Sequence, residues 1–134
     1  MSVDPTQLKR GLFALRMGVF IVFFMWTIDK FINPGHTVSV FRRYYLIEDL
    51  GLQLAYVIGA AQLLLVLGFL VGVKKRLTYG ALLLMHSIST LSTWQMYLDP
   101  WGPKNLLFFA AFPMLAAIYT LYILRDADTL LSIQ

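Results

Sequence analysis

The sequence contains no cysteine, few charged residues and only two histidines. The absence of cysteine excludes disulfides, thiolate metal sites and thiol-based electron transfer within this chain. Charged residues make up 13% of the 134 residues, whereas a soluble domain usually carries about 25%. Hydrophobic residues make up 59% of the chain. This balance indicates a protein whose surroundings are lipid rather than water.

Four long apolar stretches account for most of the chain, at residues 11–32, 52–73, 77–98 and 105–124. A helix rises about 1.5 Å per residue, so each stretch is long enough to cross the roughly 30 Å hydrocarbon layer of a bilayer. None of them has the polar outer face of a helix in a soluble bundle. We therefore expect a single-domain, all-α membrane protein, folded as an antiparallel bundle of four transmembrane helices.

Basic residues are distributed unevenly between the two sides of this expected bundle. Lys and Arg are retained on the cytoplasmic side of a membrane, so their distribution predicts the orientation. Seven of the eleven lie on the side of the two chain ends and the 74–76 turn: Lys9, Arg10, Arg16, Lys74, Lys75, Arg76 and Arg125. We expect both termini to be cytoplasmic, in a bacterial inner membrane. The formal charge of +4 then reflects lipid contact, and no aromatic-interleaved basic patch suggests a nucleic acid partner.

The connections between the stretches differ in length and character. Residues 33–51 carry aromatic and apolar side chains at helical spacing beside basic ones. They form either an amphipathic helix along the outer interface or a loop that covers the bundle. The turn at 74–76 is short, which makes the stretches on either side of it an antiparallel hairpin. Pro113 predicts a kink in the last stretch.

Three strongly polar side chains lie more than one helical turn from the ends of the expected spans. Arg16 is close enough to the cytoplasmic end to reach lipid phosphates, and it is otherwise a candidate for a functional role. Gln62 and His86 lie near the middle of their spans, where an unpaired amide or imidazole costs several kcal/mol, so both must face the bundle interior. They lie at similar depths when counted from the shared turn. We expect Gln62 and His86 to line one cavity.

Hydroxyl groups follow His86 along its helix, at Thr90, Thr93 and Tyr97. Such a column could bind a polar headgroup, relay a proton or serve only as a polar contact between helices. We expect no metal or haem, because the other histidine, His36, lies in an outer connection. No carboxylate lies within the span of His86, so a hydrolytic triad is not expected either.

Asp29 and Lys30 are adjacent opposite charges at the outer end of the first stretch. We expect Lys30 to reach headgroups or helix-end carbonyls and Asp29 to face Arg42 or Arg43. The pair is either an ordinary helix terminus or the entry site for an amphipathic ligand. The complete set of expected ligand-binding residues is Arg16, Asp29, Lys30, Gln62, His86, Thr90 and Thr93.

Three sequence features resemble the DoxX-like family of small four-helix membrane proteins. They are Arg16, the segment DKFINP with Lys30 and Pro34, and the stretch GAAQLLLVLGFLVGVKKRL. The chain departs from the family pattern at Gln62, where a glutamate is frequent, and before Lys30, where a glycine is usual. Members of that family include a quinone-linked subunit of thiosulfate oxidation, a partner in a membrane oxidoreductase complex and assembly chaperones for other membrane proteins, so the resemblance implies a role of one of these kinds.

Two functions are therefore open. The first is an accessory subunit of a membrane oxidoreductase system, with a cavity that binds a quinone or a lipid-like ligand. The second is a non-catalytic assembly or stability factor for another membrane protein. The expected partners are membrane lipids and either another membrane protein or a second copy of this chain, and quinone is the candidate cofactor. A minimal transporter is disfavoured, because no central carboxylate is present to couple ions.

Overall fold

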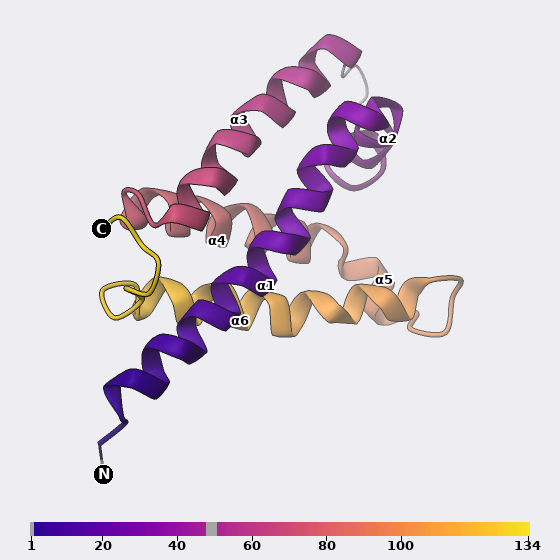
Figure 1. Ribbon diagram of the computed structural model, residues 1–134. Helices are drawn as coiled ribbons and strands as arrows, with labels where there is room; N and C mark the ends of the chain where they lie inside the picture. The colour runs from indigo at the N-terminus through magenta and orange to yellow at the C-terminus, as the bar shows by residue number, and fades with distance from the viewer. Residues whose placement is uncertain (1, 48–50) are drawn as a thin grey trace.

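The computed structural model describes residues 2–47 and 51–134 (Figure 1). Every regular element in these residues is helical. In chain order the elements are α1 (Pro5–Ile32), α2 (Pro34–Tyr44), α3 (Leu52–Val71), α4 (Lys75–Ser92), α5 (Trp94–Leu98), the 3-10 helix η1 (Asn105–Ala110) and α6 (Ala111–Ile123). The all-α class expected from the sequence is confirmed for this part of the chain.

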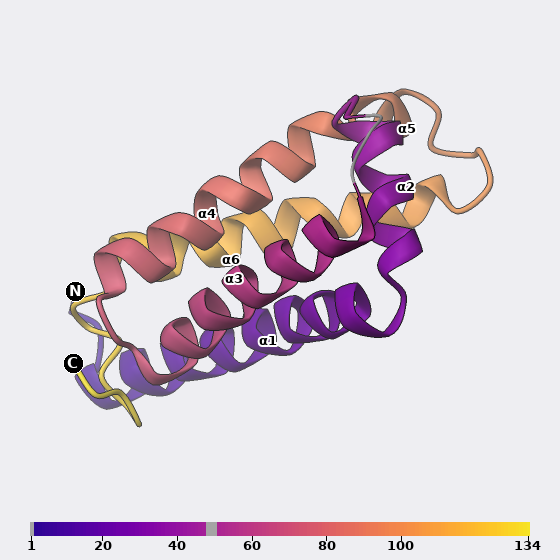
Figure 2. The ribbon, with the colours of Figure 1, turned by 90° about the horizontal axis from the view of Figure 1, so that it is seen from above.

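The four longer helices form one bundle. Helix α1 contacts α3 and α6, and α4 contacts the same two helices from the opposite side. In Figure 1 helices α1 and α3 run obliquely to α4 and α6, and in Figure 2 α2 lies across one end of the bundle. We call that end, with α2, α5 and the 99–104 connection, the loop end. The opposite end holds both chain termini and the turn between α3 and α4, and we call it the terminal end (Figure 2).

Three helical segments of the described chain are long and apolar enough to cross a membrane, judged by length and composition. They are Pro5–Ile32, Leu52–Val71 and Asn105–Ile123, the last of which combines η1 and α6. Helix α4 is not among them, because its eighteen residues include Lys75, Arg76, His86 and several hydroxyl side chains. Three of the four expected spans are thus long and apolar enough to cross a membrane, and the fourth stays a prediction.

Apart from Arg76, helix α4 nevertheless has its most polar side chains inside and several large apolar side chains outside. Its buried residues are Lys75, Thr78, Tyr79, Leu82, His86 and Thr90. Its most exposed large side chains are Leu77, Leu84, Ile88 and Leu91, each at least half exposed. Both sets repeat at helical spacing, so they form two opposite faces. A helix in water would show the reverse arrangement.

The expected stretch 77–98 does not form one continuous helix. Helix α4 ends at Ser92, Thr93 leaves the helical conformation, and the short helix α5 follows. The Thr93 hydroxyl donates to the carbonyl oxygens of Ser89 and Thr90, at 3.3 and 3.2 Å. The hydroxyl of Tyr97 donates to the same Thr90 oxygen. Side-chain hydroxyls that occupy helix carbonyls compete with the backbone ladder, which accounts for the early end.

The last expected stretch, 105–124, also changes conformation along its length. It begins as the 3-10 helix η1 and becomes α-helical at Ala111. Pro113 therefore lies in the first turn of α6, where a missing backbone N–H removes little. The kink at Pro113 stays a prediction, and the change of conformation in this stretch occurs before Pro113, where the 3-10 segment passes into the α-helix.

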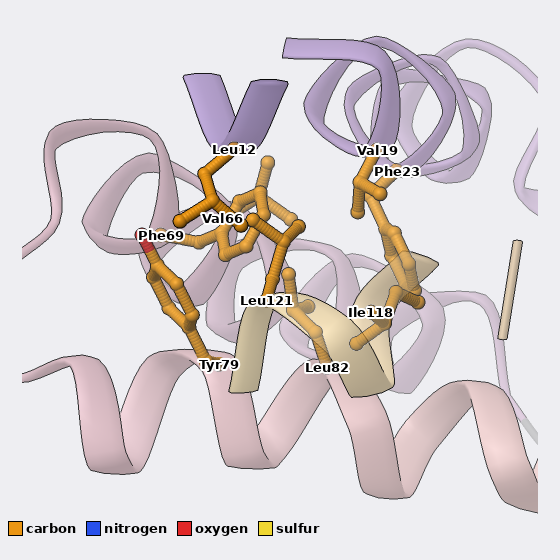
Figure 3. Packing of buried hydrophobic residues seen from close by; sticks show 9 residues of the cluster. All are labelled: Leu12, Val19, Phe23, Val66, Phe69, Tyr79, Leu82, Ile118 and Leu121. Carbon is orange, nitrogen blue, oxygen red and sulfur yellow. The ribbon is translucent and has the colours of Figure 1, made fainter. Parts of the chain in front are cut away.

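The apolar core comes from all four longer helices and is shown in Figure 3. Its buried members are Leu12, Val19 and Phe23 from α1, Val66 and Phe69 from α3, Tyr79 and Leu82 from α4, and Ile118 and Leu121 from α6. Apolar side chains gain little from leaving lipid for this core, so close packing is its main contribution to stability. Gly59 allows such packing between α1 and α3, since an added Cβ would lie 3.1 Å from the ring of Phe31.

Residues 34–44 of the longest connection form the helix α2. Of the two alternatives for this connection, the helix is therefore the one observed, and its location at the membrane interface stays a prediction. Pro34 starts α2 directly after Asn33 ends α1. The connection continues through residues 48–50, which lie outside the described residues. The short link at Asn33 fixes α2 across the loop end, where it covers the space between the longer helices.

Candidate functional site

A cavity of about 900 Å³ lies at the loop end of the bundle. Residues of α1, α2, α3 and α4 line it, and η1 contributes one side chain. Its aromatic lining consists of Phe23, Trp26, Phe41, Tyr44, Tyr45 and Phe108. Ligand sites of about 300–1,000 Å³ with mainly apolar walls and a few polar groups are typical of small-molecule binding. We call this space the loop-end cavity.

Five of the seven residues expected to bind a ligand line this cavity. They are Asp29, Lys30, Gln62, His86 and Thr93. Gln62 and His86 therefore share one cavity, as their depths in the two helices predicted. Whether these residues bind a ligand stays a prediction.

His86 is held in place by three neighbours and is only 3% exposed. Its Nε2 lies 3.1 Å from the carbonyl oxygen of Ala111 at the start of α6. The imidazole stacks on Trp26, with ring centroids 6.0 Å apart and planes at 21°. Phe23 meets the same imidazole edge to face at 6.1 Å. The Nδ1 atom is buried and has no hydrogen-bond partner among the described residues.

Gln62 bonds to α1 and not to His86. Its Nε2 donates to the hydroxyl of Thr27 at 2.9 Å, and that hydroxyl donates to the carbonyl oxygen of Phe23 at 2.7 Å. Thr27 is completely buried and Gln62 is 6% exposed. This chain of two hydrogen bonds fixes the Gln62 amide at the wall of the cavity between α1 and α3.

The expected pairing of Asp29 with Arg42 or Arg43 is wrong. The Oδ2 atom of Asp29 lies 2.6 Å from Nδ1 of His36. The physical reason is the tight Asn33 link, which places the first turn of α2 over the end of α1, while the two arginines lie in its last turn. Sequence reasoning treated His36 only as an outer-loop residue and so missed this contact.

The hydroxyl column on α4 is bonded within its own backbone. Thr90 donates to the carbonyl oxygen of His86 at 2.7 Å, and the hydroxyls of Thr93 and Tyr97 lie 2.9 Å apart. No hydrogen bond joins the imidazole of His86 to these hydroxyls in the described part of the chain. Thr93 lines the cavity, whereas Thr90 is not part of its lining. The column therefore shapes the end of α4 instead of connecting the imidazole to the surface.

Arg16 lies at the other end of the molecule, away from the loop-end cavity. It is fully buried, and its Nη1 lies 3.5 Å from Oδ1 of Asp128. Its Nη2 donates to the carbonyl oxygen of Leu130. Tyr79 donates its hydroxyl to Oδ2 of Asp128 at 2.6 Å. Of the two alternatives for Arg16, the side chain is thus bonded to protein groups and does not extend to lipid phosphates, and its position separates it from the other candidates.

The segment 124–134 supplies the partners of Arg16 and closes the terminal end. The backbone N–H of Ile133 donates to the carbonyl oxygen of Val71 at 2.8 Å. Lys75 donates from Nζ to the carbonyl oxygens of Arg125 and Asp128. Sequence reasoning did not find Asp128, although a buried arginine in a membrane protein predicts that some carboxylate is close to it. We call Arg16, Tyr79, Lys75 and Asp128 the terminal-end cluster.

Together these features define an integral membrane helical bundle, with a ligand-sized cavity at one end and a buried charge cluster at the other. The family model of the methylamine utilisation protein MauE matches residues 8–100, from α1 to the residues that follow α5. The chain belongs to this family. The match includes every residue that was expected to bind a ligand, and it does not extend to Asp128. It supports the membrane assignment without extending to the DoxX-like family. No curated protein and no solved structure matches the chain.

Proposed function

We propose that this protein is an accessory subunit of a membrane oxidoreductase system, and that it binds an amphipathic ring compound of the quinone class in the loop-end cavity. The description of its family, a methylamine utilisation protein, is compatible with such a system. The observation that carries the proposal is the cavity itself, where aromatic walls surround the polar groups of Gln62, His86 and Lys30.

The chemistry of the lining suits a ring that carries oxygen substituents. Aromatic side chains such as Trp26 and Phe41 offer flat apolar surfaces against which a ligand ring can stack. Lys30 provides a cationic donor that is partly buried at the mouth. A ligand with an isoprenoid tail would reach such a site from the bilayer, because two of the helices that line the cavity, α1 and α3, are apolar enough to span it.

The same proposal treats α4 as the fourth transmembrane helix. Its leucine-rich outer face, with Leu77, Leu84 and Leu91, suits contact with lipid. Its buried polar residues Lys75, Thr78, His86 and Thr90 lie inside the bundle, so they are not exposed to the hydrocarbon layer. Ionisable and polar groups in membrane helices are normally placed in this way.

The role proposed for this chain is to bind and position the ring compound rather than to react with it through thiols. The chain has no cysteine, so cysteine-based electron transfer would require a partner protein. A cavity at the end of the bundle lets a bound ring be presented to such a partner at the membrane surface. The partner would then supply the redox centre.

The fluorescence of Trp26 provides a direct test. Trp94 and Trp101 are well exposed and do not line the cavity, so the Trp94→Phe/Trp101→Phe variant leaves one tryptophan as a reporter. A short-chain benzoquinone should quench it saturably in detergent micelles. Gln62→Leu should weaken binding of the benzoquinone or its hydroquinone about 10-fold, and His86→Leu should weaken binding of the hydroquinone by a similar factor, because each removes a buried hydrogen-bonding group.

The matched control for these variants is Leu84→Ala, which changes an exposed α4 side chain outside the cavity. It should leave binding unchanged, and thermal melting should show all variants folded. Absence of saturable quenching by any ring compound would contradict the proposal. If the purified protein then carried a stoichiometric membrane protein partner, the role of assembly or stability factor would replace it.

A further inference from the structure

The hydrogen-bond state of His86 restricts the chemistry of the ligand. The carbonyl oxygen of Ala111 can only accept a hydrogen bond, so Nε2 of His86, at 3.1 Å, carries the proton. In a neutral imidazole the other ring nitrogen is then unprotonated and acts only as an acceptor. The tautomer is therefore fixed by α6 and not by the ligand.

The surroundings of His86 favour the neutral imidazole. Its ring lies between Trp26 and Phe23, and the residue is 3% exposed. The carboxylates in ion pairs among the described residues are Asp29 and Asp128, which pair with His36 and Arg16. No carboxylate is thus paired with His86 to balance a second proton, and a buried charge without a partner is strongly disfavoured.

The Nδ1 atom is consequently a buried acceptor that lacks a donor. It has no hydrogen-bond partner in residues 2–47 and 51–134, and its side chain lines the loop-end cavity. A buried polar atom without a partner is destabilising, and in native structures such atoms commonly have a functional explanation. A donor on a ligand would satisfy it, and because Nδ1 has almost no accessible surface, binding must displace a neighbouring side chain of the cavity wall.

We infer that the loop-end cavity selects a ring compound bearing a phenolic hydroxyl, such as a hydroquinone, which donates a hydrogen bond to Nδ1 of His86. This inference rests on the proposed function, because it specifies the ligand of the same cavity. The oxidised quinone carries only carbonyl acceptors and would place an oxygen lone pair against the lone pair of Nδ1. The hydroxyl form is therefore the better ligand.

The test compares three molecules that share one ring and one short alkyl tail: the hydroquinone, the quinone and the dimethyl ether of the hydroquinone. Binding is measured anaerobically with Trp26 as the reporter. The unmodified cavity should bind the hydroquinone at least about 10-fold more tightly than the other two, since they leave the buried acceptor unpaired. His86→Phe keeps an aromatic ring against Trp26 and should remove this preference.

Ser87→Ala is the matched control, because Ser87 is the next residue along α4, bonds to the carbonyl oxygen of Leu83 and does not line the cavity. It should preserve the preference. Equal binding of all three molecules, or tighter binding of the quinone, would overturn the inference and leave the proposed function intact. Binding of none of them would overturn both.

A second measurement does not depend on a folded His86→Phe variant. Nitrogen NMR of the imidazole in the unmodified protein should show Nδ1 unprotonated without ligand, and hydrogen-bonded on addition of the hydroquinone. A protonated Nδ1 in the free protein would overturn the inference.

Discussion

At the scale of single residues, the fully buried Arg16 depends on a carboxylate from the other end of the chain. Asp128 lies 3.5 Å from it and also accepts a hydrogen bond from Tyr79. A buried ion pair often contributes little net stability, because both partners lose their hydration. Loss of one partner is different, since it leaves the other charge buried and uncompensated.

We predict that Asp128→Asn lowers the free energy of unfolding by about 3 kcal/mol, because Arg16 loses its counter-charge while remaining buried. Denaturation with sodium dodecyl sulfate in mixed micelles would measure this value. The exposed neighbour Asp126 provides the control, and Asp126→Asn should change stability by no more than about 0.5 kcal/mol. The double variant Arg16→Met/Asp128→Leu should recover most of the loss. An Asp128→Asn variant as stable as the unmodified protein would contradict this account.

The sequence is informative about single residues only where depth and periodicity determine their environment. Gln62 and His86 could be placed in one cavity, because their distances from the shared turn need no knowledge of tertiary structure. Asp128 could not be found in this way, since the segment that carries it has no apolar periodicity to show that it folds back. The partners of Gln62 and Asp29 also depended on contacts between helices, which one sequence does not reveal.

At the scale of helices and connections, hydropathy predicts positions well and ends less well. Helix α3 lies within the expected stretch 52–73 and ends at Val71, because Gly72 adopts the left-handed conformation with φ of 75°. The prediction of one continuous helix over residues 77–98 was wrong at Thr93, where side-chain hydroxyls bond to the carbonyl oxygens of the helix. Hydropathy does not detect that competition, because threonine and serine change the mean value only slightly.

The segment 124–134 packs closely against Gly72 at the terminal end. An added Cβ would lie 2.0 Å from Oγ of Ser132, and the backbone conformation disfavours any other residue. We predict that Gly72→Ala displaces this segment and destabilises the protein by more than about 1 kcal/mol, the strain expected from the left-handed backbone alone. Limited trypsin digestion followed by intact mass analysis should then show faster cleavage after Arg125.

Gly11→Ala adds the same methyl group where nothing lies within 4 Å, so its digestion should match that of the unmodified protein. Gly72→Ala/Ser132→Gly removes the clash but retains the backbone strain, and it should be cleaved at an intermediate rate. Unchanged cleavage in Gly72→Ala would show that the segment does not depend on this contact.

At the scale of the whole molecule, the two ends of the bundle have different chemistry. The terminal end combines the buried cluster around Arg16 with basic side chains around a second depression, where Lys74, Arg76 and Arg125 lie close together. The loop end contains the aromatic cavity. Because basic residues are retained in the cytoplasm, this asymmetry predicts that the terminal end is cytoplasmic and that the cavity faces the opposite side of the membrane.

The absence of native cysteine allows this topology to be tested with single introduced cysteines. Arg76 is a suitable position at the terminal end because it is exposed, whereas the neighbouring Lys75 is only 9% exposed and bonded to residues 125 and 128. Gly35 in α2 and Trp101, which is 85% exposed, mark the loop end. We predict that Gly35→Cys and Trp101→Cys react with an impermeant maleimide in intact cells, and that Arg76→Cys reacts only after the membrane is opened. Reversed labelling of Gly35→Cys and Arg76→Cys would overturn the orientation.

The result for Trp101→Cys tests α4 separately, because the chain passes from Arg76 to Trp101 through this helix. If Trp101→Cys were protected together with Arg76→Cys, α4 would not cross the membrane and the bundle would contain only the three spans that are apolar along their whole length.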